Sequence, residues 1–262
     1  MIGIFDSGVG GLTVVKEIKK ILPDVPIIYF GDTARLPYGN KSQETIQIYS
    51  SEIVNFLKSR SCKTIVIACN SVSSTSADYL REKYRELEIY DVVSSGAEAV
   101  AETTKNKKIG VIGTTATVNS NVYKKKISQL DPKIEVFTKA CPLFVHLVEE
   151  NWINRPETKK IARTYLRELK LKKIDTLLLG CTHYPLLEKV ISGVMGRRTR
   201  VIASGEKLAK KLKADLRGGS TSIMEVEPPA EDEYFVSDLT EHFEKLAQLI
   251  LNKKIKIKKC TI

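Results

Sequence analysis

The chain has 262 residues, enough for one large or two small domains with a buried core, and its 28% charged and 7% aromatic residues are typical of a globular protein. No apolar run approaches the roughly 20 residues that cross a bilayer, and the start MIGIFDSG lacks the basic and apolar regions of an export signal, so we expect no membrane partner and a cytoplasmic location. The net charge of +11 comes largely from short lysine runs without interleaved arginines and aromatics, which is typical of solvated surface and does not favour nucleic acid as a partner.

Strand patterns alternate with amphipathic helix patterns from the N-terminus onward, which is typical of a parallel sheet with helices on both faces. The first two strands are expected at 2–5 and 27–30, with a helix between them. Ser42 is predicted to cap the next helix, and the strand after it is predicted to end at Cys69. The helix after that strand is expected to bury one apolar side, formed by Ala77, Leu80, Tyr84 and Leu87.

A similar series of elements begins again in the middle of the chain, with a strand at 109–113. A helix with its apolar face within 161–169 is expected before a strand that ends at Cys181, and a further helix is expected through 186–191. The C-terminal strand and helix, which begin at YFVSD, are expected to return to the first half after an irregular surface connection over 217–232.

These patterns predict an α/β protein made of two similar, doubly wound parallel-sheet domains. The first would contain residues 1–95 and 208–262, and the second residues 96–207. Two matching strand ends suggest an internal duplication: IVIACNS at 65–71 and LLLGCTH at 177–183 each join an aliphatic run to a small residue, a cysteine and two polar residues. Since ligands bind beyond the carboxyl ends of parallel strands, we expect the active site in a cleft between the domains, with one cysteine on each side.

Cys69 and Cys181 are therefore the strongest candidates for catalysis, because a thiolate can act as a nucleophile or as a proton base. A thiol with an ordinary pKa of about 8.5 needs a neighbouring group to assist it at neutral pH. Asp6, at the end of the first strand, is expected near Cys69, and His183 is expected to manage the proton of Cys181. The remaining cysteines form no CxxC pair, so they are expected to be structural rather than metal ligands: Cys62, Cys141 and Cys260.

The glycine-rich segment 6–11 leads into a helix, but it lacks the lysine and the spacing of nucleotide-binding loops. It is expected to allow a tight turn and the close approach of a small anion, such as a carboxylate of a dicarboxylic amino acid. Hydroxyl and amide donors near the strand ends would suit such a ligand: Ser7, Asn70, Ser71, Thr114 and Thr182. The acidic pair Glu149–Glu150 is ambiguous from sequence, because either residue could enter the cleft or lie on the surface.

Nearly the whole chain resembles the cofactor-independent, two-cysteine glutamate racemases. The resemblance rests on long motifs in the same order: GIFDSGVGGLTV (3–14), YFGDTARLPYG (29–39), ACNS (68–71), GVIGTTAT (110–117), ACPLFV (140–145) and LLLGCTHYPLL (177–187). It implies two similar α/β domains with the active site between them, frequently in a homodimer, and no pyridoxal cofactor. It also implies a role in supplying D-glutamate for bacterial peptidoglycan, and hence in cell wall biogenesis and cell shape.

In that family one cysteine thiolate removes the Cα proton of glutamate, and the opposite cysteine thiol delivers a proton to the other face. The resemblance implies that Cys69 serves one enantiomer and Cys181 the other, assisted by Asp6, His183 and Glu149. The substrate contacts that it implies are Asp6, Ser7, Tyr38, Gly39, Asn70, Ser71, Thr114, Thr182 and His183.

The chain departs from the usual family pattern at a few positions, which we expect to tune the cleft rather than to change the reaction. Ser71 stands where the family usually has threonine, and it keeps the hydroxyl donor. Ser94 or Ser95 and His146 stand where proline is common, and Ala203 stands where aspartate is frequent.

Three other functions stay open at this point. A racemase of the same family could act on aspartate or another amino acid. A thiol hydrolase could use Cys181 with His183, but it would leave Cys69 and the matched half without a role. A non-enzymatic binder could engage nucleic acid through its basic surface, in which case binding would depend steeply on salt.

Overall fold

The computed structural model describes residues 1–217 and 231–262. Its strands are β1 (Ile2–Asp6), β2 (Ile27–Gly31), β3 (Thr64–Ile67), β4 (Glu88–Asp91), β5 (Lys108–Gly113), β6 (Glu135–Ala140), β7 (Thr176–Gly180), β8 (Arg200–Ala203), β9 (Glu233–Val236) and β10 (Ile257–Lys259). Its α-helices are α1 (Leu12–Ile21), α2 (Gln43–Ser59), α3 (Asn70–Lys83), α4 (Val92–Thr103), α5 (Thr115–Asn119), α6 (Val122–Leu130), α7 (Leu143–Glu149), α8 (Pro156–Leu171), α9 (Glu188–Met195), α10 (Gly205–Arg217) and α11 (Glu241–Leu251). Short 3₁₀ turns are η1 (Val9–Gly11), η2 (Thr33–Arg35), η3 (Tyr38–Asn40) and η4 (Tyr184–Leu187).

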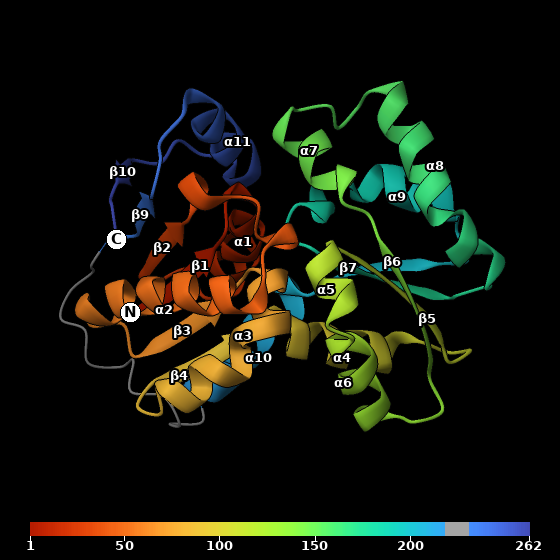
Figure 1. Cartoon of the computed structure of the whole chain (residues 1–262), viewed down its shortest axis with the longest axis horizontal. Coiled ribbons are helices and arrows are strands. Elements are labelled where there is room, and N and C mark those ends of the chain that lie inside the picture. Colours follow the sequence, from red (N-terminus) through yellow and green to blue (C-terminus); the bar gives the residue numbers. More distant parts are fainter. Residues whose placement is uncertain (218–230) are drawn as a thin grey trace.

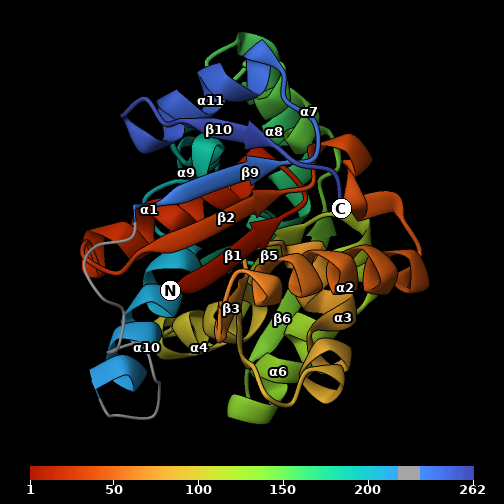
Figure 2. The same ribbon diagram turned by 90° about the vertical axis from the view of Figure 1, so that its left-hand side faces the viewer.

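Within the described residues the strands form two parallel sheets. The strand order is β10-β9-β2-β1-β3-β4 in sheet A and β6-β5-β7-β8 in sheet B. Figure 1 shows the two halves of the molecule side by side, with α3, α4 and α10 near their junction. Figure 2, turned toward sheet A, shows β10, β9, β2, β1 and β3 in this order. The predicted fold class, with two parallel-sheet halves that are each wound on both faces, is confirmed.

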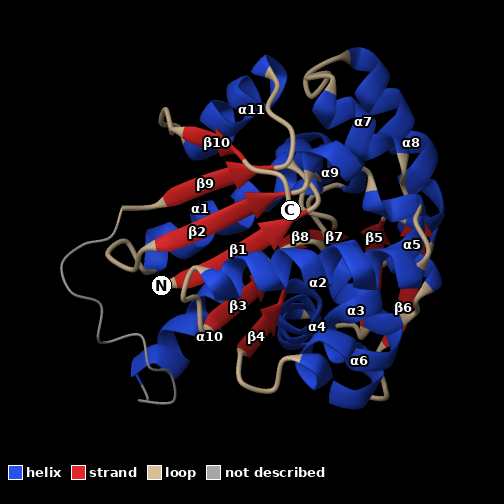
Figure 3. Cartoon of the chain, turned by 60° about the vertical axis from the view of Figure 1, so that its left-hand side comes forward, coloured by secondary structure: helices blue, strands red, loops and turns tan. Residues whose placement is uncertain are grey.

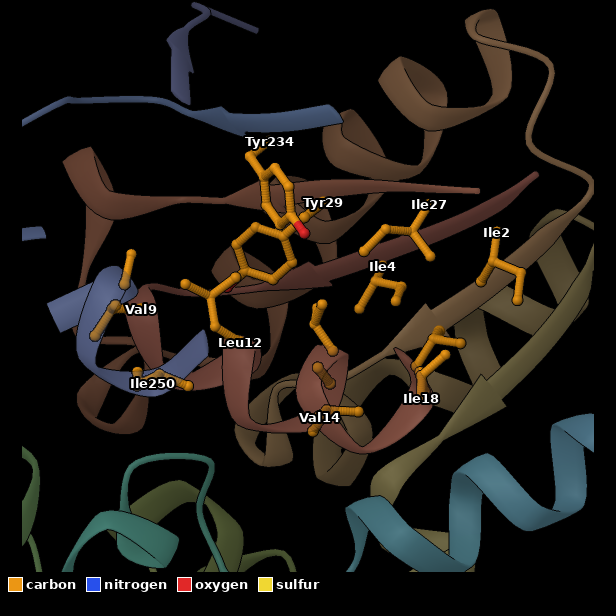
Figure 4. Packing of buried hydrophobic residues seen from close by; sticks show 14 of the residues in the cluster. Ile2, Ile4, Val9, Leu12, Val14, Ile18, Ile27, Tyr29, Tyr234 and Ile250 are labelled. Atoms are coloured by element: carbon orange, nitrogen blue, oxygen red, sulfur yellow. The ribbon is translucent and has the colours of Figure 1, made fainter. Parts of the chain in front are cut away.

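Sheet A is covered on both faces because successive side chains of its strands point to opposite sides. Ile2 and Ile4 of β1 pack with residues of α1, α10 and α11, and Figure 4 shows both close to Ile18 and Ile27 in this layer. Phe5 lies in the other layer, against α2 and α3. Each fully buried aliphatic side chain contributes about 1.5–3 kcal/mol to folding. The layers therefore fix the position of β1, the strand that ends at Asp6.

Sheet B repeats this arrangement with different helices. Leu177 and Leu179 of β7 pack toward α7, α8 and α9, while Leu178 packs toward α4 and α6. Helix α10 contacts both α1 and α4, so it joins the helical layers of the two halves. Because helices pack on both faces of β7, the residues that directly follow it, 181–183, are attached to a rigid strand.

Some elements match the predictions closely and others differ. The side chain of Ser42 accepts a hydrogen bond from the N–H of Thr45 and caps α2, as predicted. Helix α3 ends at Lys83, so the expectation that it includes Tyr84 and Leu87 is wrong, although the Tyr84 side chain is still buried between α2 and α3. After Cys181 the chain forms η4 before α9 begins, so the predicted single helix through 186–191 is split.

The strands that the sequence patterns missed are β4, β6, β8 and β10, each at an edge of its sheet. Edge strands are partly exposed and carry no continuous apolar run, which is the signal that identified the central strands. The predicted irregular connection at 217–232 lies almost entirely outside the described residues. None of the α-helices described here combines the length and apolarity needed to cross a membrane.

The direction of the strands determines where the site lies. Figure 3 shows the arrowheads of β9, β2, β1, β3 and β4 pointing the same way, toward the half of the molecule that carries sheet B. The carboxyl ends of sheet A therefore face the second half, as expected for a cleft between two parallel sheets.

Candidate active site

A small cavity of about 20 Å³ lies where the carboxyl ends of β1, β3, β5 and β7 meet. It receives both candidate thiols, Cys69 just after β3 and Cys181 just after β7. The remaining lining residues are Ser7, Leu36, Pro37, Tyr38, Gly39, Asn70, Ser71, Thr114, Val145, Thr182 and His183. The structure thus brings together two thiols that are more than a hundred positions apart in the sequence.

Cys69 precedes the first turn of α3 and is 4% exposed. Its thiol donates a hydrogen bond to Oγ of Ser7 over 3.7 Å. Burial and, to a smaller extent, the charge of Asp6 raise the pKa of Cys69 to about 12, although hydrogen bonds with Val72 and Ser7 oppose the rise. Cys69 is therefore a neutral thiol at neutral pH, which suits a proton donor.

Cys181 has a cationic rather than an anionic neighbour. Its Sγ lies 3.9 Å from Nδ1 of His183, and the other ring nitrogen, Nε2, lies 2.5 Å from Oε1 of Glu149. Burial lowers the pKa of His183, but the hydrogen bonds and charges of Cys181 and Glu149 outweigh this effect and hold the pKa well above its ordinary value. The arrangement favours an imidazolium between a carboxylate and a sulfur that can carry negative charge.

This geometry shows which residue of the acidic pair Glu149–Glu150, at the end of α7, contacts the site. Glu149 reaches His183 but does not line the cavity, so it touches the site only through the imidazole. Glu150 is exposed and caps the end of the helix.

Asp6 is fully buried and connects the two halves. Its Oδ2 accepts hydrogen bonds from the backbone N–H of Gly8 at 3.1 Å and of Gly11 at 2.9 Å, and its Oδ1 accepts one from the hydroxyl of Thr182 at 3.3 Å. Burial raises the pKa of Asp6, although His183 and these donors pull it down. Within the described residues no hydrogen bond joins Asp6 to Cys69, and Asp6 does not line the cavity, so its influence on that thiol is electrostatic.

The glycine-rich segment 6–11 permits close contact with the second half of the molecule. A Cβ on Gly10 would lie 2.5 Å from Oγ1 of Thr182 and 2.6 Å from Nδ1 of His183. Tyr29 supports the same turn, since its hydroxyl donates a hydrogen bond of 2.5 Å to the carbonyl of Gly8. At Gly10 the small residue therefore admits protein groups rather than a bound anion.

Hydrogen bonds also join the two halves on the other side of the cavity. The hydroxyls of Ser71 and Thr114 lie 3.0 Å apart. The hydroxyl of Tyr123, on α6, donates a hydrogen bond of 2.7 Å to Oδ1 of Asn70. Gly39 lies so near Thr114 that a Cβ there would be 2.8 Å from Cβ of Thr114.

A buried polar network holds the loop that carries Tyr38 and Gly39. Asp32 is fully buried and accepts hydrogen bonds from the Tyr38 hydroxyl, from Nε of Arg35 at 2.6 Å and from Oγ of Ser237 at 2.8 Å. Because all these partners bond to one carboxylate, the network fixes the Tyr38 side chain in the lining of the cavity.

Sequence reasoning did not identify Tyr29, Asp32 or Tyr123 as parts of the site. Asp32 directly follows β2, so the rule that ligand-binding residues lie at strand ends would have found it. Tyr29 is a buried residue inside a strand, and Tyr123 occupies an apolar position of a helix. Neither of these two has a local sequence signal that separates it from ordinary core.

The departures from the family pattern lie mostly outside the cavity. Ser94 donates hydrogen bonds to Asp91 at the start of α4, and Ser95 bonds the Asp91 carbonyl. His146 is exposed on α7. Ala203 lines a second cavity of about 590 Å³, which Cys181 and Asn70 also line. That larger cavity does not include Cys69 or His183 among its lining residues, so the chemistry belongs to the smaller one.

The residues described here contain no group of three or more His, Cys, Asp and Glu side chains arranged to hold a metal ion. The donors that line the cavity are hydroxyls, thiols, an imidazole and the carboxamide of Asn70. This set suits the carboxylate and ammonium groups of a small amino acid.

Comparison with known proteins gives a consistent result. A family model described as Asp/Glu/hydantoin racemase matches residues 2–212. The chain is 44% identical over 254 residues to "Glutamate racemase 2" of Caldanaerobacter subterraneus subsp. tengcongensis, covering 97% of this chain and 94% of that one. It is also 44% identical over 254 residues to a glutamate racemase of Geobacter metallireducens, covering 97% and 93%.

Solved structures lead to the same group of proteins. The glutamate racemase isoform RacE1 of Bacillus anthracis superposes with a TM-score of 0.94 at 36% identity, covering 100% of this chain and 97% of that one. The glutamate racemase of Francisella tularensis, in complex with D-glutamate, gives 0.91 at 34% identity, covering 99% and 97%. An aspartate racemase of Picrophilus torridus, at 20% identity and a TM-score of 0.54 over 82% of this chain and 93% of that one, shares only the fold.

Proposed function

Because the chain belongs to the Asp/Glu/hydantoin racemase family and is therefore an isomerase, we propose that it interconverts L- and D-glutamate. The observation that carries the proposal is that one cavity is lined by two thiols from the two halves of the molecule, Cys69 and Cys181. Inversion at Cα needs one group on each face, because the proton must leave one side and arrive at the other. Relatives of nearly full length that are named glutamate racemase support glutamate as the substrate.

The proton moves between the two sulfurs by way of Cα. In one direction the Cys181 thiolate takes the Cα proton, the electron pair of the C–H bond delocalises into the adjacent carboxylate, and the Cys69 thiol gives its proton to the opposite face. The step leaves Cys181 as a thiol and Cys69 as a thiolate, which is the arrangement required for the reverse direction. Burial keeps Cys69 a neutral thiol, which suits its role as the proton donor in this direction.

Asp6 and Glu149 act through neighbouring groups rather than on the substrate. Glu149 holds the His183 imidazolium, which in turn stabilises negative charge on Cys181. Asp6 holds the turn at 8–11 and Thr182 in fixed positions. The substrate contacts of the proposal that line the cavity are Ser7, Tyr38, Gly39, Asn70, Ser71, Thr114, Thr182 and His183.

Acidification of the Cα proton is assigned to fixed dipoles, without a cofactor. Hydroxyl and amide donors that surround the cavity stabilise the charge that develops on the substrate carboxylate. Such preorganised donors act strongly here because the cavity is small and the thiols are nearly sealed from water.

The alternatives have less support. The aspartate racemase neighbours share the fold at 18–20% identity, whereas relatives named glutamate racemase reach 44%. A thiol hydrolase would use Cys181 with His183 and leave Cys69, on the same cavity, without a function.

Wider roles follow from the family resemblance and are part of the proposal. They are supply of D-glutamate for peptidoglycan, a cytoplasmic location and a homodimeric assembly. The domain boundaries at 95/96 and 207/208 are proposed as well, with the first domain built around sheet A and the second around sheet B.

The experiment that tests the function is a circular-dichroism assay of the purified protein with D- and L-glutamate and no added cofactor. We expect both enantiomers to approach the racemic mixture, with deuterium from D₂O entering at Cα. D- and L-aspartate are measured in parallel. A preference for aspartate would overturn the choice of substrate, and inactivity toward both amino acids would overturn the proposed function.

A further inference from the structure

Tyr123 lies outside the lining of both cavities, yet its hydroxyl reaches the site. The residue is 2% exposed, on α6, in the half built around sheet B. Its ring fits into a slot between α4 and β7, where a Cβ on Gly96 would lie 3.3 Å from its Oη and a Cβ on Gly180 would lie 3.2 Å from its Cε2. The slot directs the hydroxyl across the boundary between the halves to Oδ1 of Asn70, 2.7 Å away.

Asn70 occupies a position where the orientation of a carboxamide matters. It directly follows Cys69, is 3% exposed and lines the cavity that contains both thiols. A carboxamide has an acceptor oxygen and a donor NH₂ group, and the two are easily exchanged by a flip. Within the described residues the Tyr123 hydroxyl has no hydrogen-bond partner besides Asn70, so its proton must go to the Asn70 oxygen.

This bond determines which end of the carboxamide is free. With Oδ1 engaged, Nδ2 is the free end, and it has no acceptor among the residues that the structure describes. An NH₂ group fixed beside Cys69 is a neutral donor suited to an anionic oxygen. The oxygens that gain charge when Cα loses its proton are those of the adjacent carboxylate.

We propose that Tyr123 is a positioning residue that fixes the Asn70 carboxamide with its NH₂ group toward the cavity, where it binds the carboxylate attached to Cα. This inference rests on the proposed amino-acid racemisation. Because the two partners come from different halves, the donor is oriented only when the halves are assembled as they are here.

The test compares two variants that each lose one buried tyrosine hydroxyl. In Tyr123→Phe the ring stays and only the bond to Asn70 is lost. The matched control is Tyr84→Phe, whose hydroxyl bonds the Ser51 carbonyl at 3.1 Å and Oδ1 of Asn55 at 2.9 Å, away from both cavities. We expect Tyr123→Phe to lower kcat/KM by about tenfold in both directions, with kcat carrying most of the loss, and Tyr84→Phe to stay within twofold of wild type.

A double-mutant cycle separates positioning from a general structural effect. If Tyr123 acts through Asn70, adding Tyr123→Phe to the Asn70→Ala variant changes kcat/KM by less than twofold. The same tenfold loss in that background would overturn the inference. Wild-type kcat/KM in the single Tyr123→Phe variant would overturn it too.

A readout that needs no turnover keeps the two proposals distinct. The side-chain NH₂ resonances of Asn70 are assigned by ¹⁵N-asparagine labelling and by their loss in Asn70→Ala. They are expected to shift and broaden in Tyr123→Phe and to stay unchanged in Tyr84→Phe. Unchanged resonances in Tyr123→Phe overturn the inference even in an active racemase, whereas changed resonances in a protein that racemises neither glutamate nor aspartate would overturn only the proposed function.

Discussion

The fit of Gly10 against the second half of the molecule provides a sensitive test of how the cleft is built. A methyl group on this residue would lie 2.5 Å from Oγ1 of Thr182 and 2.6 Å from Nδ1 of His183, whereas ordinary contact begins at 3.4 Å. The two halves would therefore have to separate by about 1 Å, because packed interiors have little free space to absorb the methyl group. A misplacement of about 1 Å in an active site costs on the order of 100-fold in rate. We expect Gly10→Ala to lower kcat/KM for both glutamate enantiomers by about that factor.

Gly193→Ala is the matched control, since nothing lies within 4 Å of a Cβ at that position of α9. It should keep full activity because the added methyl group meets no neighbour. It should also keep its stability, because an alanine in an exposed helix interior is favoured over glycine by about 1 kcal/mol. Gly10→Ala should also lose about 1–3 kcal/mol of stability through overpacking, and its Tm should fall by several degrees.

The assay for both variants is circular dichroism of glutamate in each direction, with thermal unfolding measured in the same buffer. Activity of Gly10→Ala within threefold of wild type would refute the reasoning, because it would mean that the contact between the halves does not set the catalytic geometry. A thermal loss without a kinetic loss would refute it in the same way.

Three further predictions concern the charged groups and the thiols. Cys69→Ala and Cys181→Ala should each lower racemisation by about 10²–10⁴-fold, while the remaining thiol still exchanges the Cα hydrogen of one enantiomer with D₂O in an NMR assay; near-normal racemisation by either variant would exclude the two-thiol mechanism. Glu149→Gln should move the alkaline limb of the kcat/KM profile to lower pH, because it removes a charge that raises the pKa of His183. A raised imidazole pKa stabilises the fold below about pH 6.5, and this contribution is lost as pH rises through the raised pKa. The Tm deficit of Glu149→Gln should therefore be largest at low pH. A Tm deficit that does not vary with pH would count against the imidazolium. Asp6→Asn should be less active but more stable than wild type, because burial raises the pKa of Asp6 and makes the ionised carboxylate costly. Its Tm advantage should therefore grow as pH rises above about 4. Tm differences that are equal at pH 4 and pH 8 would contradict this.

The parts of the fold that could be predicted are those in which local sequence and tertiary environment agree. The central strands β1, β3, β5 and β7 are buried on both faces, so they appear in the sequence as continuous aliphatic runs. Their ends could be identified from the change to small and polar residues, which is why Cys69 and Cys181 were found together. The edge strands have no such run because one side of each has no neighbouring strand.

The predictions about the site reached the residues that line the cavity but not those that support them. Asp6 was expected near Cys69, because both lie at neighbouring strand ends, and its charge does raise the pKa of that thiol. The sequence did not indicate that its carboxylate also accepts hydrogen bonds from the turn at 8–11 and from Thr182. Such contacts depend on how the two halves meet, and no local pattern encodes that. Tyr123 was missed for the same reason, since the role of its hydroxyl depends on its hydrogen bond to Asn70 in the other half.

The burial of the two thiols has a consequence for repeated turnover. Under the proposed mechanism each reaction leaves the protein in the opposite protonation form, with the proton exchanged between Cys69 and Cys181. The form that has just released one enantiomer can accept only that same enantiomer as a substrate until protons pass between the site and water. Because the thiols are only 4% and 6% exposed, this recovery step is shielded and competes with binding at high substrate concentration. The protonation form of the free protein thus depends on which enantiomer it released last.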